Sequence, residues 1–123
     1  MLDSWERTQL LLGADAMARL SRARVAVFGI GGVGGYAVEA LARCGVGALD
    51  LIDNDRVSHS NINRQIIATH ATLGQYKVDA ARERVASINP KCTVRTYTTF
   101  SSPRRQTRLI FPNTTTWWTP STR

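Results

Sequence analysis

A group of glycines follows directly after an apolar run at 25–28. The group comprises Gly29, Gly31, Gly32, Gly34 and Gly35. An apolar helical pattern follows at Val38, Leu41 and Ala42. Strand, glycine turn and helix are the three parts of a crossover that binds a nucleotide. Such a turn presents the free N–H groups of the first helical turn to an anion, and the helix dipole adds to the attraction. The alternative is a glycine-rich turn without a ligand.

The glycines have separate physical roles in this interpretation. Gly29 allows a tight turn, since a positive φ costs little without a Cβ atom. Gly31 and Gly32 allow the backbone to approach a phosphate closely, and Gly34 allows the helix to pack against the strand. The turn therefore predicts a phosphate site at the start of a helix.

Two acids follow the second apolar run. Asp53 ends that run 19 residues after Gly34, and Asp55 lies two residues further on. An acid about 20 residues beyond such glycines usually holds a ribose hydroxyl, so Asp53 is the better candidate. Asp55 is either a loop cap or a ribose or metal ligand.

A polar stretch at 54–72 shows little periodicity and contains Asn61, Arg64 and Gln65. Long segments without clear structure inside a compact domain are often functional. Lys77 follows at the start of the next helical pattern. Arginine and lysine in this position could bind phosphates, although both could instead be surface charges. A nicotinamide-dependent oxidoreductase would explain the glycines and Asp53, but not these four polar residues.

These residues must be positioned by alternating strands and helices, which predict an α/β fold with a Rossmann-like, three-layer arrangement and a parallel sheet. The expected strands are 24–29, 48–53 and 93–98, and the expected helices are 33–44 and 76–88. An amphipathic segment near the N-terminus is broken by Gly13 into two short helical pieces.

Composition excludes several classes of protein. The 123 residues suffice for one small domain, and no apolar run approaches the roughly 20 residues of a membrane span. The charged N-terminus lacks the apolar core of a signal peptide, so a cytoplasmic location is expected. Cys44 and Cys92 form neither a disulfide framework nor a zinc motif. Four arginines after residue 100 contribute more than half of the net charge of +7, so charge alone does not establish nucleic-acid binding.

Together the motifs resemble the adenylating enzymes related to ubiquitin-activating enzyme and to the sulfur-carrier activators of thiamine and molybdopterin synthesis. The signature of that family is Gly-x-Gly-Gly-x-Gly, an Asp that ends the second strand, Asn-x-x-Arg-Gln, and Gly-x-x-Lys. In this chain these motifs are 29–34, Asp53, 61–65 and 74–77. The resemblance covers about residues 4–100, and the combined spacing is more specific than any single motif.

The resemblance implies that ATP converts a carboxylate into an acyl-adenylate. Arg64 and Lys77 would neutralise the charge that builds on the α-phosphate. Asn61 would donate a hydrogen bond to the phosphates, Gln65 would belong to the nucleotide site, and Asp53 would hold the ribose. Mg²⁺ would accompany the ATP.

The resemblance also implies partners. Arg7 matches a family arginine that reaches into the ATP site of the partner subunit, which implies a homodimer; the alternative is a surface arginine. The residues in these motifs are most similar to those of family members that act on tRNA. In those members, ring closure within a threonyl group displaces AMP. A sulfur-carrier or ubiquitin-like protein substrate, with a sulfur-transfer partner, is the alternative. His59 and His70 are expected to be solvated loop residues.

One departure from the family concerns residues 101–123. Family members carry a fourth strand that ends like Val-Val-Asp-Ala-Ile-Asp, whose first Asp is expected to bind Mg²⁺, and no such motif is readable here. We therefore expect 1–100 to be the N-terminal part of a nucleotide-binding domain, incomplete at its C-terminal side, and 101–123 to be a non-native, disordered tail. The chain itself would then be inactive, or a nucleotide-binding module without chemistry.

The genetic code yields a testable explanation of that tail. Trp117 and Trp118 require TGG-TGG, and Thr119 begins with AC, so reading from the last base of each tryptophan codon gives Val-Asp. The neighbouring codons permit Tyr-Asp-Tyr-Val-Val-Asp-Ala-Ile-Asp-Thr, which contains the missing motif. We predict that residues 101–123 are translated out of frame. Sequencing the gene checks this, and stop codons in the alternative frame would contradict it.

Overall fold

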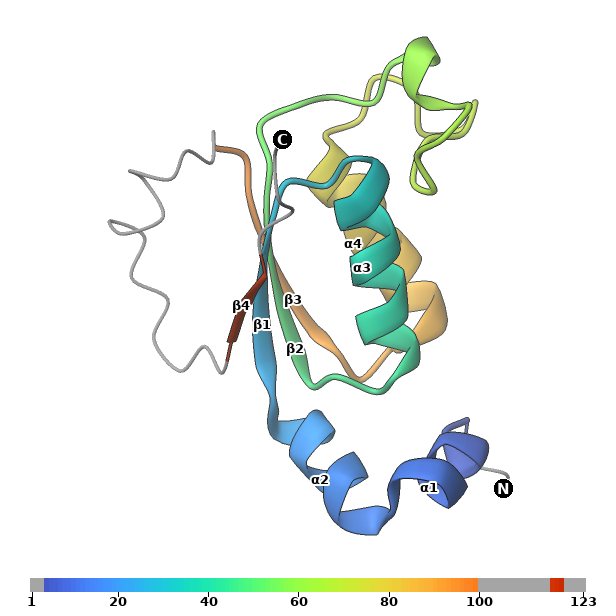
Figure 1. Ribbon diagram of the computed structural model, residues 1–123. Coiled ribbons are helices and arrows are strands. Elements are labelled where there is room, and N and C mark those ends of the chain that lie inside the picture. The colour runs from blue at the N-terminus through green and yellow to red at the C-terminus, as the bar shows by residue number, and fades with distance from the viewer. Residues whose placement is uncertain (1–3, 100–115, 119–123) are drawn as a thin grey trace.

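The computed structural model describes residues 4–99 and 116–118, and its elements alternate between helix and strand (Figure 1). The helices are α1 (Glu6–Leu12), α2 (Ala14–Arg22), α3 (Gly32–Arg43) and α4 (Lys77–Ile88), with a short 3₁₀ turn, η1 (His59–Asn61). The strands are β1 (Arg24–Phe28), β2 (Ala48–Ile52), β3 (Thr93–Tyr97) and β4 (Thr116–Trp118). No helix in the described ranges has the length and apolar character needed to cross a membrane.

The strands form one parallel sheet in the order β3-β2-β1-β4. In register, Val25 lies opposite Leu49, and Leu49 opposite Val94. The predicted α/β class is confirmed, and the three predicted strands and two predicted helices begin and end within one residue of those observed. Gly13 separates α1 from α2 with φ +89°, as its place between two apolar helical pieces predicted.

The tail differs from the expectation at one place. Thr116–Trp118 form β4, which pairs with β1 from Val25 to Val27, so the expectation of a tail wholly outside the fold is wrong for these three residues. A strand edge presents unpaired N–H and C=O groups, and a segment of β-branched and aromatic residues can satisfy them. The other residues of the tail lie outside the described ranges.

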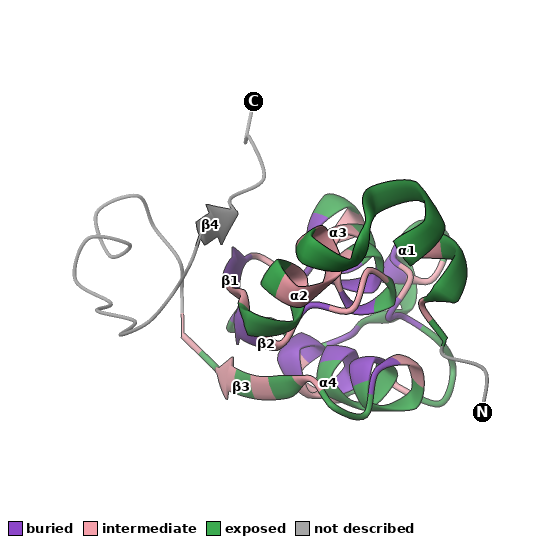
Figure 2. Cartoon of the chain, turned by 90° about the horizontal axis from the view of Figure 1, so that it is seen from below, coloured by how far each residue is buried: buried purple, intermediate pink, exposed green. Residues whose placement is uncertain are grey.

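One face of the sheet is covered by α3 and α4, which lie on the same side of it (Figures 1 and 2). Alternate strand residues point to this face, as the period of two requires, and they meet the apolar stripes of both helices. The core residues contributed by these elements are Val25, Val27, Leu49, Leu51, Val38, Ala42, Val78, Ala80, Ala81 and Val85. This packing fixes the starts of α3 and α4 relative to the ends of β1 and β2.

A buried ion pair lies on the opposite face of the sheet. Arg24 Nε and Nη2 donate to the two carboxylate oxygens of Asp50 at 2.7 and 2.8 Å, and Asp50 is fully buried. The hydrogen bond that Arg24 donates to Asp50 raises the pKa of Arg24. The pair joins the first residue of β1 to the middle of β2. Asp50 is therefore a structural acid.

A second ionic group joins α3 to α4. The buried Glu39 carboxylate accepts hydrogen bonds from Arg43 at 2.9 Å and from Arg84 at 2.8 Å. The Arg84 hydrogen bond, followed by that of Arg43, lowers the pKa of Glu39 against the opposing effect of burial. Because Arg84 comes from α4, the carboxylate ties the two helices that carry the candidate site.

We predict that Glu39→Gln lowers the free energy of unfolding by about 1 kcal/mol at neutral pH. The value is discounted for solvent screening, because the Arg43 and Arg84 side chains are 57% and 46% exposed. Since the folded-state pKa is lowered, this stabilisation is present above the ordinary value of 4.5 and is lost as the pH falls through the lowered pKa. Urea unfolding over a descending pH series checks this, with Glu83→Gln as the exposed control. A difference that persists unchanged in acid would contradict it.

We also predict that Gly47→Ala lowers stability by more than about 2 kcal/mol. A Cβ atom at Gly47 would lie 2.0 Å from the carbonyl oxygen of Ser21, so backbone would have to move. Gly47 also donates to Leu20 O and accepts from Thr93 N, which ties α2 to β3. Thermal unfolding measures the loss. Gly32→Ala is the control, because a Cβ there meets nothing within 4 Å; equal stability of the two variants would refute the prediction.

Candidate functional site

The glycine turn lies at the carboxyl edge of the parallel sheet, between β1 and α3 (Figure 1). Gly29 has φ +88°, as the tight turn required, and its N–H donates to Ile52 O at 2.8 Å. The turn therefore crosses from β1 towards the end of β2 before α3 begins. Ligands in open α/β sheets bind at this edge.

The start of α3 is open. Gly31 occupies the N-cap position, no side chain caps the helix, and its first turn contains no acid. The first helical hydrogen bond runs from Gly35 N to Gly31 O, so the three N–H groups before it have no partner within the helix. A Cβ at Gly32 would meet nothing within 4 Å, and one at Gly31 would meet only Gln65 Nε2 at 3.8 Å. The free N–H groups, the dipole of α3 and the open space at Gly31 and Gly32 together suit a bound anion.

Asp53 holds this turn against the loop that follows β2. Its carboxylate accepts from Ile30 N at 2.7 Å and from Asp55 N at 2.8 Å, one bond on each oxygen. Asp53 is only 9% exposed. A carboxylate has about four acceptor positions, so it retains capacity for ligand hydroxyl groups.

Lys77 brings a cation to the same edge. It is the first residue of α4 and is 6% exposed, and its Nζ lies 3.9 Å from Asp55 Oδ2. Burial of an ammonium group is costly, and the positive end of a helix dipole adds repulsion. The Asp55 carboxylate, 66% exposed and at this distance, compensates only weakly. A bound anion would offset this unfavourable placement.

Asn61 and Gln65 place amide groups in the loop beside the turn. Asn61 Oδ1 accepts from Ser58 N at 2.9 Å and Ser58 Oγ at 3.0 Å, which leaves its Nδ2 as the donor end. Gln65 is 7% exposed, its Nε2 is the side-chain atom nearest Gly31, and its Oε1 has no partner among the described residues. An unpaired buried polar atom is costly. Its position beside the glycine turn is consistent with a role in ligand binding.

The structure does not bring Arg64 and Arg7 into this group. Arg64 is exposed, and its Nη1 donates to Ser60 O at 2.7 Å and to Asn63 Oδ1 at 2.9 Å within its own loop. Arg7 is exposed on α1, which lies at the other end of the sheet from the glycine turn (Figure 1). His59 and His70 are exposed, with ring centroids 5.8 Å apart.

The loop after β2 is more ordered than its polar composition indicated. Val57, Ile67 and Ala68 are buried in the main core, and Arg56 forms an antiparallel bridge with Tyr76. The short apolar run at 66–68 was the signal for this packing. Nothing in the spacing of the sequence pointed to Arg56 or Tyr76.

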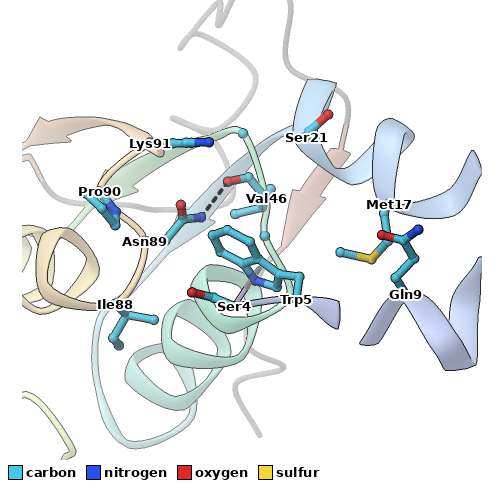
Figure 3. A pocket seen from close by; sticks show the side chains of 12 residues that line it. Ser4, Trp5, Gln9, Met17, Ser21, Val46, Ile88, Asn89, Pro90 and Lys91 are labelled. Carbon is cyan, nitrogen blue, oxygen red and sulfur yellow. Dashed lines mark hydrogen bonds between the residues drawn. The ribbon is translucent and has the colours of Figure 1, made fainter. Parts of the chain in front are cut away.

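A separate cavity of about 660 Å³ lies at the opposite edge of the sheet, near α1 and α2 (Figure 3). Trp5 and Met17 line it on one side and the turn after α4 on the other. Asn89 Nδ2 donates to Val46 O at 3.1 Å in its wall, and Trp5 Nε1 donates to Arg43 O at 2.8 Å. None of the predicted nucleotide-binding residues lines this cavity.

Known proteins share sequence with most of this chain. The tRNA threonylcarbamoyladenosine dehydratase of Bacillus subtilis is 48% identical over 94 residues, which is 76% of this chain and 37% of that protein. The molybdopterin-synthase adenylyltransferase of Salmonella typhimurium is 46% identical over 92 residues, 73% of this chain and 37% of that protein. This chain therefore spans less than two fifths of the length of these relatives.

Solved structures give the same result. That of Escherichia coli tRNA N6-threonylcarbamoyladenosine dehydratase superposes with a TM-score of 0.82 and 41% identity, over 85% of this chain and 44% of that one. The same Escherichia coli protein in complex with ATP gives a TM-score of 0.80 and 40% identity, over 87% of this chain and 46% of that one. The profile of the ThiF family matches residues 6–115, and this chain belongs to the ThiF family.

Proposed function

We propose that this chain binds ATP at the glycine turn and provides the nucleotide half of a site that adenylates a carboxylate. The open N-terminus of α3, bordered by Asp53 and the buried Lys77, is the observation that carries the proposal. The superposition on a related protein in complex with ATP supports it.

The chemistry explains why cations are needed. A carboxylate is a poor electrophile; its oxygen attacks the α-phosphorus, the bond to the β-phosphate oxygen breaks, and pyrophosphate leaves. The acyl-adenylate then reacts with a nucleophile at its carbonyl carbon, and AMP leaves. Because two anions combine in the first step, positive groups must stabilise the charge that develops. Lys77 would serve this purpose, and Arg64 would exchange Ser60 O for a phosphate oxygen.

The other site residues would bind and orient the nucleotide. Asp53 would accept from the ribose hydroxyls with its remaining lone pairs. The Nδ2 of Asn61 would donate to a phosphate, because Ser58 already holds its oxygen. The buried Oε1 of Gln65 would gain a partner from the bound nucleotide or a water molecule held with it.

We propose tRNA as the substrate, with the carboxylate on the threonyl group of a modified adenosine. Ring closure within that group would then displace AMP. Two dehydratase relatives, from Bacillus subtilis and Haemophilus influenzae, share 48% and 50% identity with this chain and support the choice. A sulfur-carrier protein with a C-terminal carboxylate is the second candidate, favoured by the similarity to molybdopterin-synthase adenylyltransferase.

Mg²⁺ fits the described residues poorly. No group of three His, Cys, Asp or Glu side chains gathers in residues 4–99 and 116–118, and both oxygens of Asp53 already accept backbone bonds. Asp55 alone offers an exposed carboxylate, which Lys77 faces. Mg²⁺ would arrive with the ATP phosphates.

We further propose a homodimer in which Arg7 serves the nucleotide site of the second copy. Helix α1, which carries Arg7, lies at the other end of the sheet from the glycine turn of the same chain (Figure 1). The same helix exposes 84% of Leu10, 84% of Leu11 and 47% of Leu12. Adjacent exposed leucines commonly mark a protein interface.

We predict that Lys77→Ala weakens ATP binding by tenfold or more, because a buried cation beside the open helix is lost. In a full-length relative, the matching change should lower adenylation by on the order of 10²-fold, the scale of one preorganised donor. Fluorescence or calorimetric titration with ATP measures the first effect. Lys91→Ala, an exposed lysine before β3, is the control. Equal affinity of the two variants would exclude Lys77 from the site, and binding of NADH in place of ATP would favour an oxidoreductase.

ATP–pyrophosphate exchange separates an enzyme from a nucleotide-binding module. We predict ATP binding with weak or no exchange in this chain, because the family motif expected to bind Mg²⁺ is absent from its sequence. Exchange at the rate of an intact dehydratase would contradict this prediction. Loss of ATP binding as well would contradict the nucleotide site itself.

A further inference from the structure

The loop between β2 and α4 is closed at its base by backbone hydrogen bonds. Val57 N donates to Gln75 O at 2.8 Å, and Gly74 N donates to Val57 O at 3.0 Å. Just outside the 57–75 loop, Lys77 N donates to Asp55 O at 3.0 Å. The two ends of the loop are therefore held side by side, just where Asp55 and Lys77 face one another.

Arg56 adds a side-chain closure at the same point. It forms the antiparallel bridge with Tyr76, its guanidinium carbon lies 4.0 Å from the centroid of the Tyr76 ring, and its Nη1 donates to Gly74 O at 2.8 Å. The last bond spans 18 residues of sequence. Gly74 has φ +83°, a conformation that other residues adopt with strain. One exposed arginine thus binds the opposite end of the loop through three different contacts.

The residues enclosed by this closure are those of the candidate site. Asn61, Arg64 and Gln65 lie within the loop, and Lys77 is joined covalently to Tyr76. Movement of Tyr76 away from Arg56 would carry Lys77 with it and would separate Lys77 from Asp55. The contact between Arg56 and Tyr76 therefore affects where Lys77 lies relative to Asp55.

We propose that Arg56 and Tyr76 form a clamp that positions Lys77 and the 57–75 loop for nucleotide binding. This rests on the proposed function for its effect on ATP, but not for its effect on the loop. Both are positioning residues, since neither is placed among the nucleotide-binding groups. An exposed cation–π contact is worth about two- to fivefold in an equilibrium constant, and the hydrogen bond to Gly74 O adds to it.

Limited trypsin digestion of the full chain tests the loop directly. Cleavage after Arg64, followed by mass spectrometry, reports opening of the loop. Arg56→Ala should speed this cleavage about fivefold while the midpoint of thermal unfolding stays within a few degrees of the wild type. Arg82→Ala is the matched control, because it removes an exposed arginine that borders the same surface and forms an ion pair with Asp79 in its own helix.

Tyr76 provides a second pair of variants. Tyr76→Phe keeps the aromatic face and should cleave like the wild type, whereas Tyr76→Leu should resemble Arg56→Ala. Arg56→Lys should rescue part of the protection, since it keeps the cation but loses the fixed fork of the guanidinium. Equal cleavage of Arg56→Ala and Arg82→Ala, or wild-type protection in Tyr76→Leu, would overturn the clamp.

ATP titration adds the functional readout. The clamp predicts that Arg56→Ala weakens ATP binding about fivefold and that Arg82→Ala leaves it unchanged. If the wild-type chain fails to bind ATP, the nucleotide site is refuted, and the digestion still decides whether the loop is clamped. If ATP binds equally to the wild type and Arg56→Ala while cleavage differs, the positioning of Lys77 is refuted.

Discussion

The candidate site depends on the two backbone hydrogen bonds that the carboxylate of Asp53 accepts. One oxygen accepts from Ile30 N in the glycine turn and the other from Asp55 N in the next loop. Two segments from different crossovers are thereby joined at the carboxyl edge of the sheet, and both oxygens are fixed by backbone donors. Charge-assisted hydrogen bonds to backbone N–H groups are among the stronger ones in proteins. The turn can therefore keep its open helix start without a side-chain cap.

The site combines backbone N–H donors with one buried cation. The unbonded N–H groups of α3 point out of the same edge of the sheet at which Lys77 begins α4. Glu39 holds these two helices together from the other side of their packing interface. The packing of α3 against α4 therefore keeps Lys77 buried at this edge, although burial of an ammonium group is costly.

Much of this arrangement could be predicted from the sequence, and the limits of prediction are physical. The alternation of apolar residues from Val25 to Phe28 and the stripe through Val78 and Val85 set the strands and helices, because burial periodicity is local. Asp53 was found from its distance to Gly34, and Gly29 has the positive φ that a tight turn required. These features are encoded by neighbours in sequence.

Long-range contacts could not be predicted in the same way. The contact of Arg56 with Tyr76 joins the ends of a loop whose polar composition hides its packing. Arg64, identified by motif, bonds to Ser60 O and Asn63 Oδ1 within its own loop in the structure. The pairing of Thr116–Trp118 with β1 was missed because three residues in a polar segment give no periodic signal. The rest of the expected tail and its reading frame remain predictions.

The most direct test of the nucleotide site is a titration of the ¹⁵N-labelled chain with ATP, followed by NMR of the backbone amides. The largest shifts should fall on the amides of Gly31 to Gly34, because they lie at the open start of α3. The amide of Lys77 should also shift, since the bound phosphates would lie beside its side chain, although its N–H donates to Asp55 O. Asp55 should respond as well, because its N–H binds the Asp53 carboxylate. Shifts confined to the cavity around Trp5, or no shifts at millimolar ATP, would contradict the account.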